Sequence, residues 1–486
     1  MTSAIHTLDR RVLWALLVCA SLVASAASQT LPDRSRPPAL APTPQLDLPS
    51  IQKRSLSNGL AVWLIESHEV PIAQLNVVVR AGGGDDPAGK FGTASLTSAM
   101  LDEGAGTRTA LELADAVEFL GASLVTGSSF DSSAVRLNVP VERLGDALPL
   151  LADVTMRPRF PATELDRLRQ ERLTALLQAR DDPASIAPMA FSRIVFGQMH
   201  RYGTGLVGTA ASLETLTVGD LSAFHAAHYQ PANAVLVVVG DVRPEGVLPE
   251  LEKHFGSWKA GAPARRTNVA TAPQLSGRQI YIVDKPEAEQ SQIRIGGVGV
   301  PRSTPDYFPL LVLNTILGGS FTSRLNQNLR EVHGYAYGAS SGFDMRLAAG
   351  PFVAAAGVQT DKTAEAVREF LHELTRIAEP VPAAEIDKAK NYVALGFPAE
   401  FESSGDLSRR LEELIVYQLP DDHFERYIAN VQAVTAGALQ RAAMTYIQPS
   451  RFAVVVVGDR KTIEPGIRAL NLGPVRIMSV DEVLGP

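Results

Sequence analysis

The sequence predicts an α+β protein made of two related domains. The main observation is an internal echo: residues 229–241 read YQPANAVLVVVGD, and residues 447–459 read IQPSRFAVVVVGD, 218 positions later. The same offset joins Thr217 to Thr435, and chance similarity rarely keeps one offset across a helix, a proline and a strand. At 486 residues the chain is also long for a single core. Strand and helix patterns are mixed without strict alternation, which favours α+β over a parallel βαβ sheet.

The composition is that of an ordinary globular protein. Hydrophobic residues make up 45% of the chain and charged residues 20%. The net charge at pH 7 is −7. Because a nucleic-acid groove needs a basic face, we expect no nucleic-acid partner.

Residues 1–26 have the features of a secretory signal peptide. A basic start with Arg10 and Arg11 is followed by an apolar run and by Ala-Ser-Ala at 24–26, a small-x-small cleavage pattern. The run is too short for a spanning helix, although an uncleaved membrane anchor stays an alternative. We therefore expect an exported protein, in the periplasm, with no stable membrane span after cleavage. The single cysteine, Cys19, would leave with the signal, so we expect no disulfide and no thiol chemistry.

The first domain is predicted over residues 51–255, after a Pro-rich extended linker at residues 27–50. Hydrophobic periodicity and turn signals place its elements. The expected strands are residues 60–65, 73–79, 134–139 and 235–239, and the expected helices are residues 93–101, 111–120, 144–156, 162–179 and 216–228.

The second domain is predicted over residues 277–470. Residues 256–276, with scattered Gly, Pro and charge, are predicted to be the interdomain linker, and residues 471–486 a tail. The expected strands are residues 279–283, 292–298, 352–358 and 453–457, and the expected helices are residues 307–317, 363–378 and 383–395.

Four segments carry a family resemblance. They read GDDPAGKFGTASLTSAMLDEGAGT (84–107), ALPLLADVTMRPRF (147–160), YQPANAVLVVVGDV (229–242) and LGGSFTSRLNQNLREVHGYAY (317–337). Together they resemble the pitrilysin–insulinase family, in its mitochondrial-processing-peptidase-like branch, over about residues 51–470. The resemblance implies two homologous domains, each with a mixed, mostly antiparallel sheet packed with helices, forming half of a clamshell. Two such chains pair in that family to enclose a peptide.

The zinc motif of active family members is degenerate here. Those members carry HxxEH on one helix, where two histidines four apart grip zinc and the glutamate polarises its water, and a distant glutamate completes the ligands. Ser95 and Ala99 stand at the histidine positions, Ser98 at the position of the base and Ala175 at that of the distant ligand. We therefore expect no metal site and no cofactor in this chain. The resemblance implies that zinc belongs to a homologous HxxEH partner subunit.

A second pair of functional positions is kept. In active members the second half supplies an Arg and a Tyr, seven residues apart, that reach the substrate; the matching residues are Arg330 and Tyr337. An Arg fork can hold a peptide carbonyl or carboxylate, and a Tyr hydroxyl can donate to a developing oxyanion. The alternative is structural: Arg330 paired to Glu331 or Asp344, and Tyr337 packed on the sheet.

Other polar residues have structural explanations that we favour. His225 and His228 could offer two metal ligands three residues apart on a helix, but no acidic base follows them. His333 could touch substrate, although an exposed loop histidine is the simpler interpretation. The acidic pair at positions 85–86 is predicted to be a solvated turn. Gly318 is expected to end a helix in the left-handed cap conformation that glycine prefers.

These observations lead to one functional hypothesis and two rivals. The first is a non-catalytic subunit of a heterodimeric zinc metallopeptidase, which binds peptide and supplies Arg330 and Tyr337 to the partner's active site. The second is a structural, assembly or peptide-binding protein of the same fold with no peptidase role. The third is an enzyme acting alone through another site, such as that around His225. Fold does not fix function, so the choice rests on the site.

Overall fold

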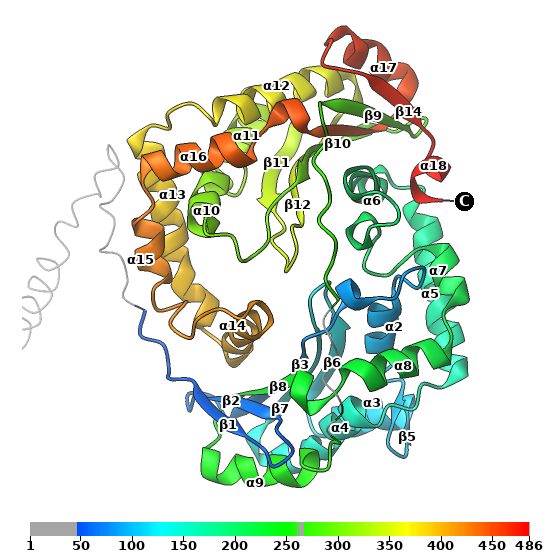
Figure 1. Ribbon diagram of the computed structural model, residues 1–486, viewed down its shortest axis with the longest axis vertical. Helices are drawn as coiled ribbons and strands as arrows, with labels where there is room; N and C mark the ends of the chain where they lie inside the picture. Colours follow the sequence, from blue (N-terminus) through cyan, green and yellow to red (C-terminus); the bar gives the residue numbers. More distant parts are fainter. Residues whose placement is uncertain (1–45, 260, 262–266, 486) are drawn as a thin grey trace, which may run out of the picture. The chain divides into compact units, whose positions relative to one another are not determined.

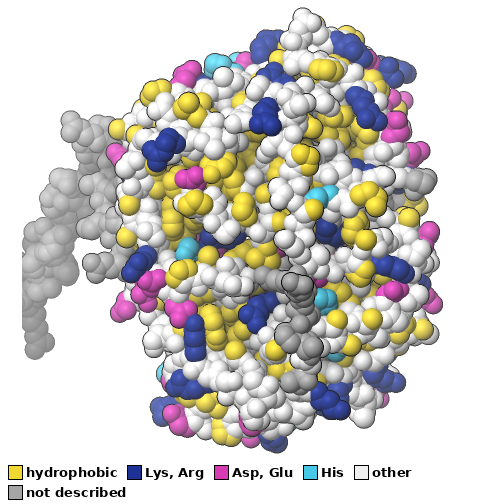
Figure 2. All heavy atoms as spheres, in the orientation of Figure 1, with side chains coloured by type: hydrophobic (Ala, Val, Ile, Leu, Met, Phe, Trp, Pro, Cys, Tyr) yellow, Lys and Arg dark blue, Asp and Glu magenta, His cyan; other side chains and the backbone are white. Residues whose placement is uncertain are grey.

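A computed structural model describes residues 46–259, 261 and 267–485. The predicted signal peptide and most of the Pro-rich linker lie outside these residues, as does part of the predicted interdomain linker. In the part of the chain that is described, no helix combines the length and apolar character needed to cross a membrane. On the face shown in Figure 2, Lys and Arg side chains are scattered among Asp and Glu.

Two six-stranded sheets organise the chain (Figure 1). The first sheet has the order β1 (Gln52–Ser55), β2 (Ala61–Glu66), β8 (Ala234–Gly240), β3 (Ile72–Val79), β7 (Ser133–Pro140), β6 (Ser123–Ser128). The second sheet has the order β11 (Ala336–Phe343), β12 (Pro351–Gln359), β10 (Gln290–Val298), β13 (Ala453–Gly458), β9 (Gln279–Asp284), β14 (Val475–Met478). Most neighbours are antiparallel, whereas β2 with β8, β13 with β9 and β14 with β9 are parallel. The predicted α+β class with mixed, mostly antiparallel sheets is confirmed.

Helices accompany both sheets. The helices before the second sheet are α2 (Thr93–Ala99), α3 (Ala110–Phe119), α4 (Leu144–Met156), α5 (Ala162–Ala179), α6 (Pro183–Phe196), α7 (Ala210–Thr215), α8 (Val218–His228) and α9 (Pro244–Phe255). Those that follow are α10 (Tyr307–Leu317), α11 (Arg324–Asn326), α12 (Thr363–Arg376), α13 (Ala383–Gly396), α14 (Ser404–Tyr417), α15 (Tyr427–Gln432), α16 (Ala436–Tyr446), α17 (Arg460–Ala469) and α18 (Val480–Leu484). A short hairpin, β4 (Gly104–Ala105) and β5 (Arg108–Thr109), follows α2.

The internal echo extends to elements beyond the two segments seen in the sequence. β2, β3, β7 and α8 each have a counterpart that begins 218 residues later, namely β9, β10, β12 and α16. Thr217 and Thr435, the equivalent residues seen in the sequence, both cap the N-terminus of their helix through the side-chain oxygen. The duplication therefore lets equivalent elements of the two halves be compared, although the offset is not constant: Ser123 of β6 and Ala339 of β11, which pair with the equivalent Asn138 and Ala356, are 216 residues apart.

The two halves exchange one helix each. α6 packs on β10 and β13 of the second sheet, and α14 packs on β3 and β8 of the first. Every residue of β8 and of β13 is buried, so each sheet needs an apolar cover on both faces. On the exchanged face of the second sheet, Phe191 of α6 shares a core with Val455 and Val457. Neither helix was among the elements predicted from the sequence, and Pro188 inside α6 obscures its helical pattern.

A polar contact fixes α14 on the first sheet. Glu412 of α14 accepts hydrogen bonds from Nη2 of Arg136 at 2.6 Å and from Nε at 2.9 Å. The same carboxylate accepts from Nδ2 of Asn76 at 2.7 Å. Bidentate guanidinium–carboxylate pairs fix orientation as well as position, so this contact sets how the helix lies on the strands.

The C-terminal residues belong to the second sheet. Residues 471–486 were predicted to be a tail, but β14 pairs with β9 and α18 packs on α6. Val483 of α18 is fully buried in the same core as Phe191. Such a short strand and helix gain their stability from tertiary packing, which the sequence pattern does not display.

Candidate functional site

A buried ion pair fixes the start of α2, the helix that carries the degenerate zinc motif. Asp86 accepts hydrogen bonds from the backbone N–H groups of Gly92 and Ala94, each at 2.7 Å. Its carboxylate lies 2.9 Å from the guanidinium of Arg201, and both side chains are buried. Burial raises the pKa of Asp86, while Arg201 opposes that shift. The prediction that Asp86 lies in a solvated turn is wrong. Its carboxylate is buried, because the folded chain brings Arg201 into contact with it.

The four degenerate positions carry small, uncharged side chains. Ser95 and Ala99 of α2 are half-buried, and Ala175 of α5 is exposed. Ser98 is buried, and its hydroxyl lies 3.2 Å from that of Tyr229. Ser98 therefore belongs to the core, and no general base occupies its position.

α5 meets α2 through Arg172, one turn before Ala175. Nη2 of Arg172 donates to the backbone carbonyl of Ser95 at 3.0 Å. Nη1 is buried and has no hydrogen-bond partner among the described residues. Burial lowers the pKa of this guanidinium. A fixed cation at this place disfavours a second positive charge.

These residues do not fit zinc. The metal requires thiolate, imidazole or carboxylate ligands, and the two helices present hydroxyls, methyl groups and a guanidinium. Across residues 46–259, 261 and 267–485, no three His, Cys, Asp or Glu side chains come together in a way that could hold a metal ion.

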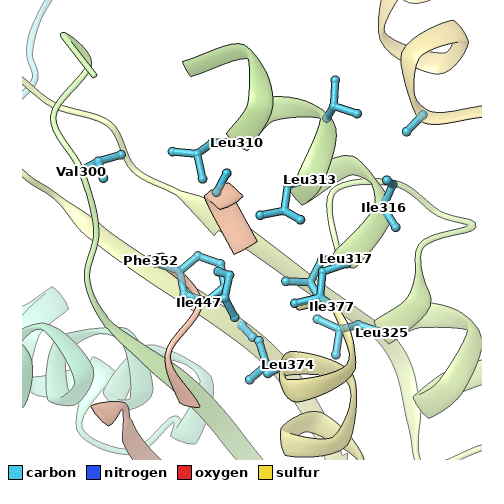
Figure 3. Close-up of a cluster of buried hydrophobic side chains, with 14 of the residues drawn as sticks. Val300, Leu310, Leu313, Ile316, Leu317, Leu325, Phe352, Leu374, Ile377 and Ile447 are labelled. Atoms are coloured by element: carbon cyan, nitrogen blue, oxygen red, sulfur yellow. The ribbon is translucent and has the colours of Figure 1, made fainter. Parts of the chain in front are cut away.

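The counterparts in the second half are core residues. The offset of 218 equates Ser95, Ser98 and Ala99 with Leu313, Ile316 and Leu317 of α10, which pack in the cluster shown in Figure 3. Leu313 and Leu317 are fully buried. In the second half the equivalent positions are therefore filled by packed apolar side chains. In the first half Ser95 and Ala99 are partly accessible to solvent.

The half-buried Arg330 forms a surface cluster with two exposed aromatic residues, Tyr337 and Phe321. The Arg330 guanidinium carbon lies 4.5 Å from the ring centre of Phe321 and 5.2 Å from that of Tyr337. Tyr337 is 91% exposed and Phe321 is 62% exposed. Arg330 also pairs with Glu331, Nε···Oε1 3.3 Å. The alternative that Tyr337 packs on the sheet is wrong, whereas the local pairing of Arg330 is present but lies at the surface, where such pairs contribute little.

The backbone at this cluster is set by a π-helical turn and an edge strand. Arg330 lies in the turn Gln327–Val332, and Tyr337 lies near the start of β11. Among the described strands β11 pairs with β12 alone, and on its other edge the backbone N–H groups of Ala339 and Ser341 donate to Oδ1 of Asn326 and to the carbonyl oxygen of Gly318, each at 3.1 Å.

Gly318 ends α10, as predicted, but for another reason. Its φ is −157°, which is not the left-handed conformation. A Cβ at this position would come within 2.3 Å of the backbone nitrogen of Ser341. Glycine is needed because β11 passes this close to the helix end.

The histidines singled out in the sequence lie in structural settings. Nε2 of His225 lies 2.9 Å from the carbonyl oxygen of Thr155, and the ring stacks on Tyr229 with centroids 4.7 Å apart. Burial lowers the pKa of both His225 and His228. His333 stacks on Tyr335 with ring centroids 4.9 Å apart.

Two family models match the chain. The insulinase model (peptidase family M16) matches residues 61–209, and the model of the peptidase M16 inactive domain matches residues 215–393. The chain belongs to the insulinase (M16) peptidase family. The predicted resemblance is therefore confirmed.

Insulinase-family relatives match along most of their length. A protein described as an uncharacterized zinc protease from Mycobacterium leprae is 26% identical over 426 residues, 86% of this chain and 94% of the relative. A similarly described Bacillus subtilis protein is 24% identical over 74% of this chain and 87% of its own. Among solved structures, a peptidase M16 inactive domain from Pseudomonas fluorescens is 26% identical with a TM-score of 0.78, covering 84% of this chain and 98% of that one. A Helicobacter pylori protease with a TM-score of 0.78 is 23% identical, covers 84% of this chain and 100% of that one, and shares the fold.

Three residues of this insulinase-family site were missed in the sequence. Asp86 was misinterpreted, and Arg172 and Phe321 were not singled out. Phe321 lies three residues after Gly318 in the segment that carries the resemblance, so its position was a usable signal. Arg172 gave no signal, because its role depends on α5 lying beside α2.

Proposed function

We propose that this chain is the non-catalytic subunit of a heterodimeric zinc metallopeptidase. It binds peptide, and Arg330 and Tyr337 complete the active site of a homologous partner that carries HxxEH and the zinc. The observation that carries the proposal is a contrast within one chain: the metal positions have no ligands, whereas Arg330 and Tyr337 are held together in the open.

The electrostatics of the cluster suit a carbonyl or carboxylate of a bound peptide. The pair between Arg330 and Glu331 is partly exposed, and such pairs contribute about 0–1 kcal/mol, so a substrate group can replace Glu331. Phe321 and Tyr337 hold the guanidinium over their rings, each contact contributing about 0.5–1 kcal/mol. Within the described part of the chain the Tyr337 hydroxyl has no hydrogen-bond partner, so it can donate to an oxyanion at the partner's metal.

The neighbouring backbone suits an extended peptide. The start of β11, around Tyr337, can offer main-chain hydrogen bonds to such a peptide, whereas further along this edge the N–H groups of Ala339 and Ser341 are already engaged. A hollow of about 420 Å³ opens beside the π-helical turn and is lined by Asn328, Val332 and Tyr392 among others. A side chain of a peptide lying along this surface could enter it. Export to the periplasm is part of the same proposal and rests on the features of residues 1–26.

Co-purification tests this function. The tagged chain is isolated from an envelope extract, its partners are identified, and the eluate is assayed on a quenched peptide with and without chelator. The expected result is an HxxEH partner of similar size and chelator-sensitive cleavage that neither chain shows alone. Chelator-sensitive cleavage by this chain alone would refute the proposal and support a site such as that around His225.

Single substitutions separate a substrate role from a scaffold role. Arg330→Ala and Tyr337→Phe should each lower kcat/KM of the complex by about tenfold or more, since each removes a group that acts on the substrate. Arg426→Ala is the matched control, because Arg426 is an exposed arginine paired only to Asp422 in the described part of the chain. An intact complex with unchanged cleavage in Arg330→Ala would favour the structural or assembly role instead.

A further inference from the structure

An apolar hollow outside the peptidase-like site lies between α5, α6 and α18, which are neighbours in Figure 1. Its volume is about 390 Å³. The apolar walls come from a leucine stripe on α5 (Leu173, Leu176, Leu177), from Met189 on α6 and from Leu484 on α18. This size and lining are those of small-molecule sites, which pair apolar walls with a few polar groups.

Two arginines line the hollow, and they differ in how their charge is compensated. Arg180 is paired with Asp481 and donates to the carbonyl of Gly485 at 2.7 Å. Arg193 donates to Oε1 of Gln198 at 2.8 Å, and no described carboxylate lies within ion-pair distance of it. Burial lowers the pKa of Arg193, as expected for a partly desolvated cation with no anionic partner.

The hollow has a place for an anion at Arg193 and, beside it, an apolar region that can take a tail. Met189 and Arg193 are four residues apart on α6, so they share one face of that helix. The leucine stripe runs from Leu173 towards Arg180 on α5, a length of about 10 Å at 1.5 Å per residue. Other polar groups at the wall are already engaged: the Thr204 hydroxyl accepts from Arg201 at 3.1 Å. The hollow therefore offers one cation that has no carboxylate partner among the described residues, beside a lining that is mostly apolar.

We propose that this hollow binds a monocarboxylate with an unbranched apolar tail, such as a medium-chain fatty acid. The carboxylate pairs with Arg193, and the tail lies between Met189 and the leucine stripe of α5. The inference is independent of the proposed peptidase role, because it uses neither the cluster at Arg330 nor a partner chain.

Calorimetric titration of the full chain with decanoate tests the proposal. Saturable binding of one decanoate per chain is expected, with a rise in the melting temperature, since a ligand that binds the folded state stabilises it. Decylammonium, with the same tail and the opposite charge, should not bind. Hexanoate should bind more weakly than decanoate, because a shorter tail buries less apolar surface.

Two variants place the ligand in the hollow. Arg193→Gln should weaken decanoate binding by about tenfold or more, the loss of a charge-assisted hydrogen bond, while Arg426→Gln, on an exposed arginine elsewhere, should not. Leu176→Trp should fill the channel and abolish binding. Unchanged binding in both hollow variants, equal binding of decylammonium, or no binding of any tail length would overturn the proposal. Thermal melts of each unliganded variant establish that it is folded.

Discussion

Removing the carboxylate of Asp86 should strongly destabilise the protein. In Asp86→Ala, the backbone N–H groups of Gly92 and Ala94 lose their acceptor, and Arg201 is left as a buried cation. Breaking a buried ion pair from one side costs about 3–5 kcal/mol, because the remaining charge is uncompensated. We expect a loss of unfolding free energy in this range, measured by urea denaturation at an unchanged m-value.

Two comparisons isolate the mechanism of that loss. Asp86→Asn combined with Arg201→Met removes both charges and keeps an acceptor for the helix start, so it should be less destabilising than Asp86→Ala. Asp181→Ala breaks an exposed pair, since the Asp181 side chain is 87% exposed and lies 2.9 Å from Nζ of Lys285. It should cost no more than about 1 kcal/mol. A loss below about 1 kcal/mol in Asp86→Ala would refute the argument that this pair anchors α2.

Three further predictions follow from packing, exchange and charge. Leu313→Ala should lower the free energy of unfolding by about 3–5 kcal/mol, because it opens a cavity in the core. The equivalent Ser95→Ala should change this free energy by under about 0.5 kcal/mol. Similar losses for the two variants in urea denaturation would contradict the contrast between the halves. Residues 46–259 expressed alone should show no cooperative thermal transition, because the first sheet lacks α14 and α6 lacks its sheet, while co-expression with the second half should restore one. Hydrogen bonding to Asp241 raises the pKa of His68, so this contact stabilises the fold below the ordinary pKa of about 6.5 and is lost as pH rises through the raised value. An NMR titration should show that Asp241→Asn lowers the pKa of His68, and an unchanged pKa would refute the assignment.

Because α6 and α14 are exchanged, the predicted domain boundaries divide the strands of the two halves but not all of their helices. Strands of each sheet come from one half of the chain, as the duplication suggested, but one helix over each sheet comes from the other half. The contact of Glu412 with Arg136 joins residues 276 positions apart. Stability is therefore expected to be shared between the halves, because neither sheet is covered on both faces by its own half.

The sequence by itself determined the duplication, the α+β class, the family and the loss of zinc ligands. Each of these follows from local information: periodicity sets the elements, one repeated offset sets the two halves, and a motif shows which side chains are absent. The positions of Arg330 and Tyr337 were also determined by the sequence, since their spacing within one segment identifies them. Even the boundaries of α4, α5 and α10 were predicted to the residue, and residues that break helices mark two of them: Pro161 directly precedes α5 and Gly318 directly follows α10.

Only the tertiary structure decided which side chains meet. Asp86 became a buried anchor because Arg201 folds over it, and Gly318 was required because β11 passes the end of α10. Tyr337 and Phe321 could have packed inward, and the structure places them in the open around Arg330. Such outcomes depend on long-range packing and on the free-energy cost of leaving a buried charge unpaired, and local sequence patterns predict neither.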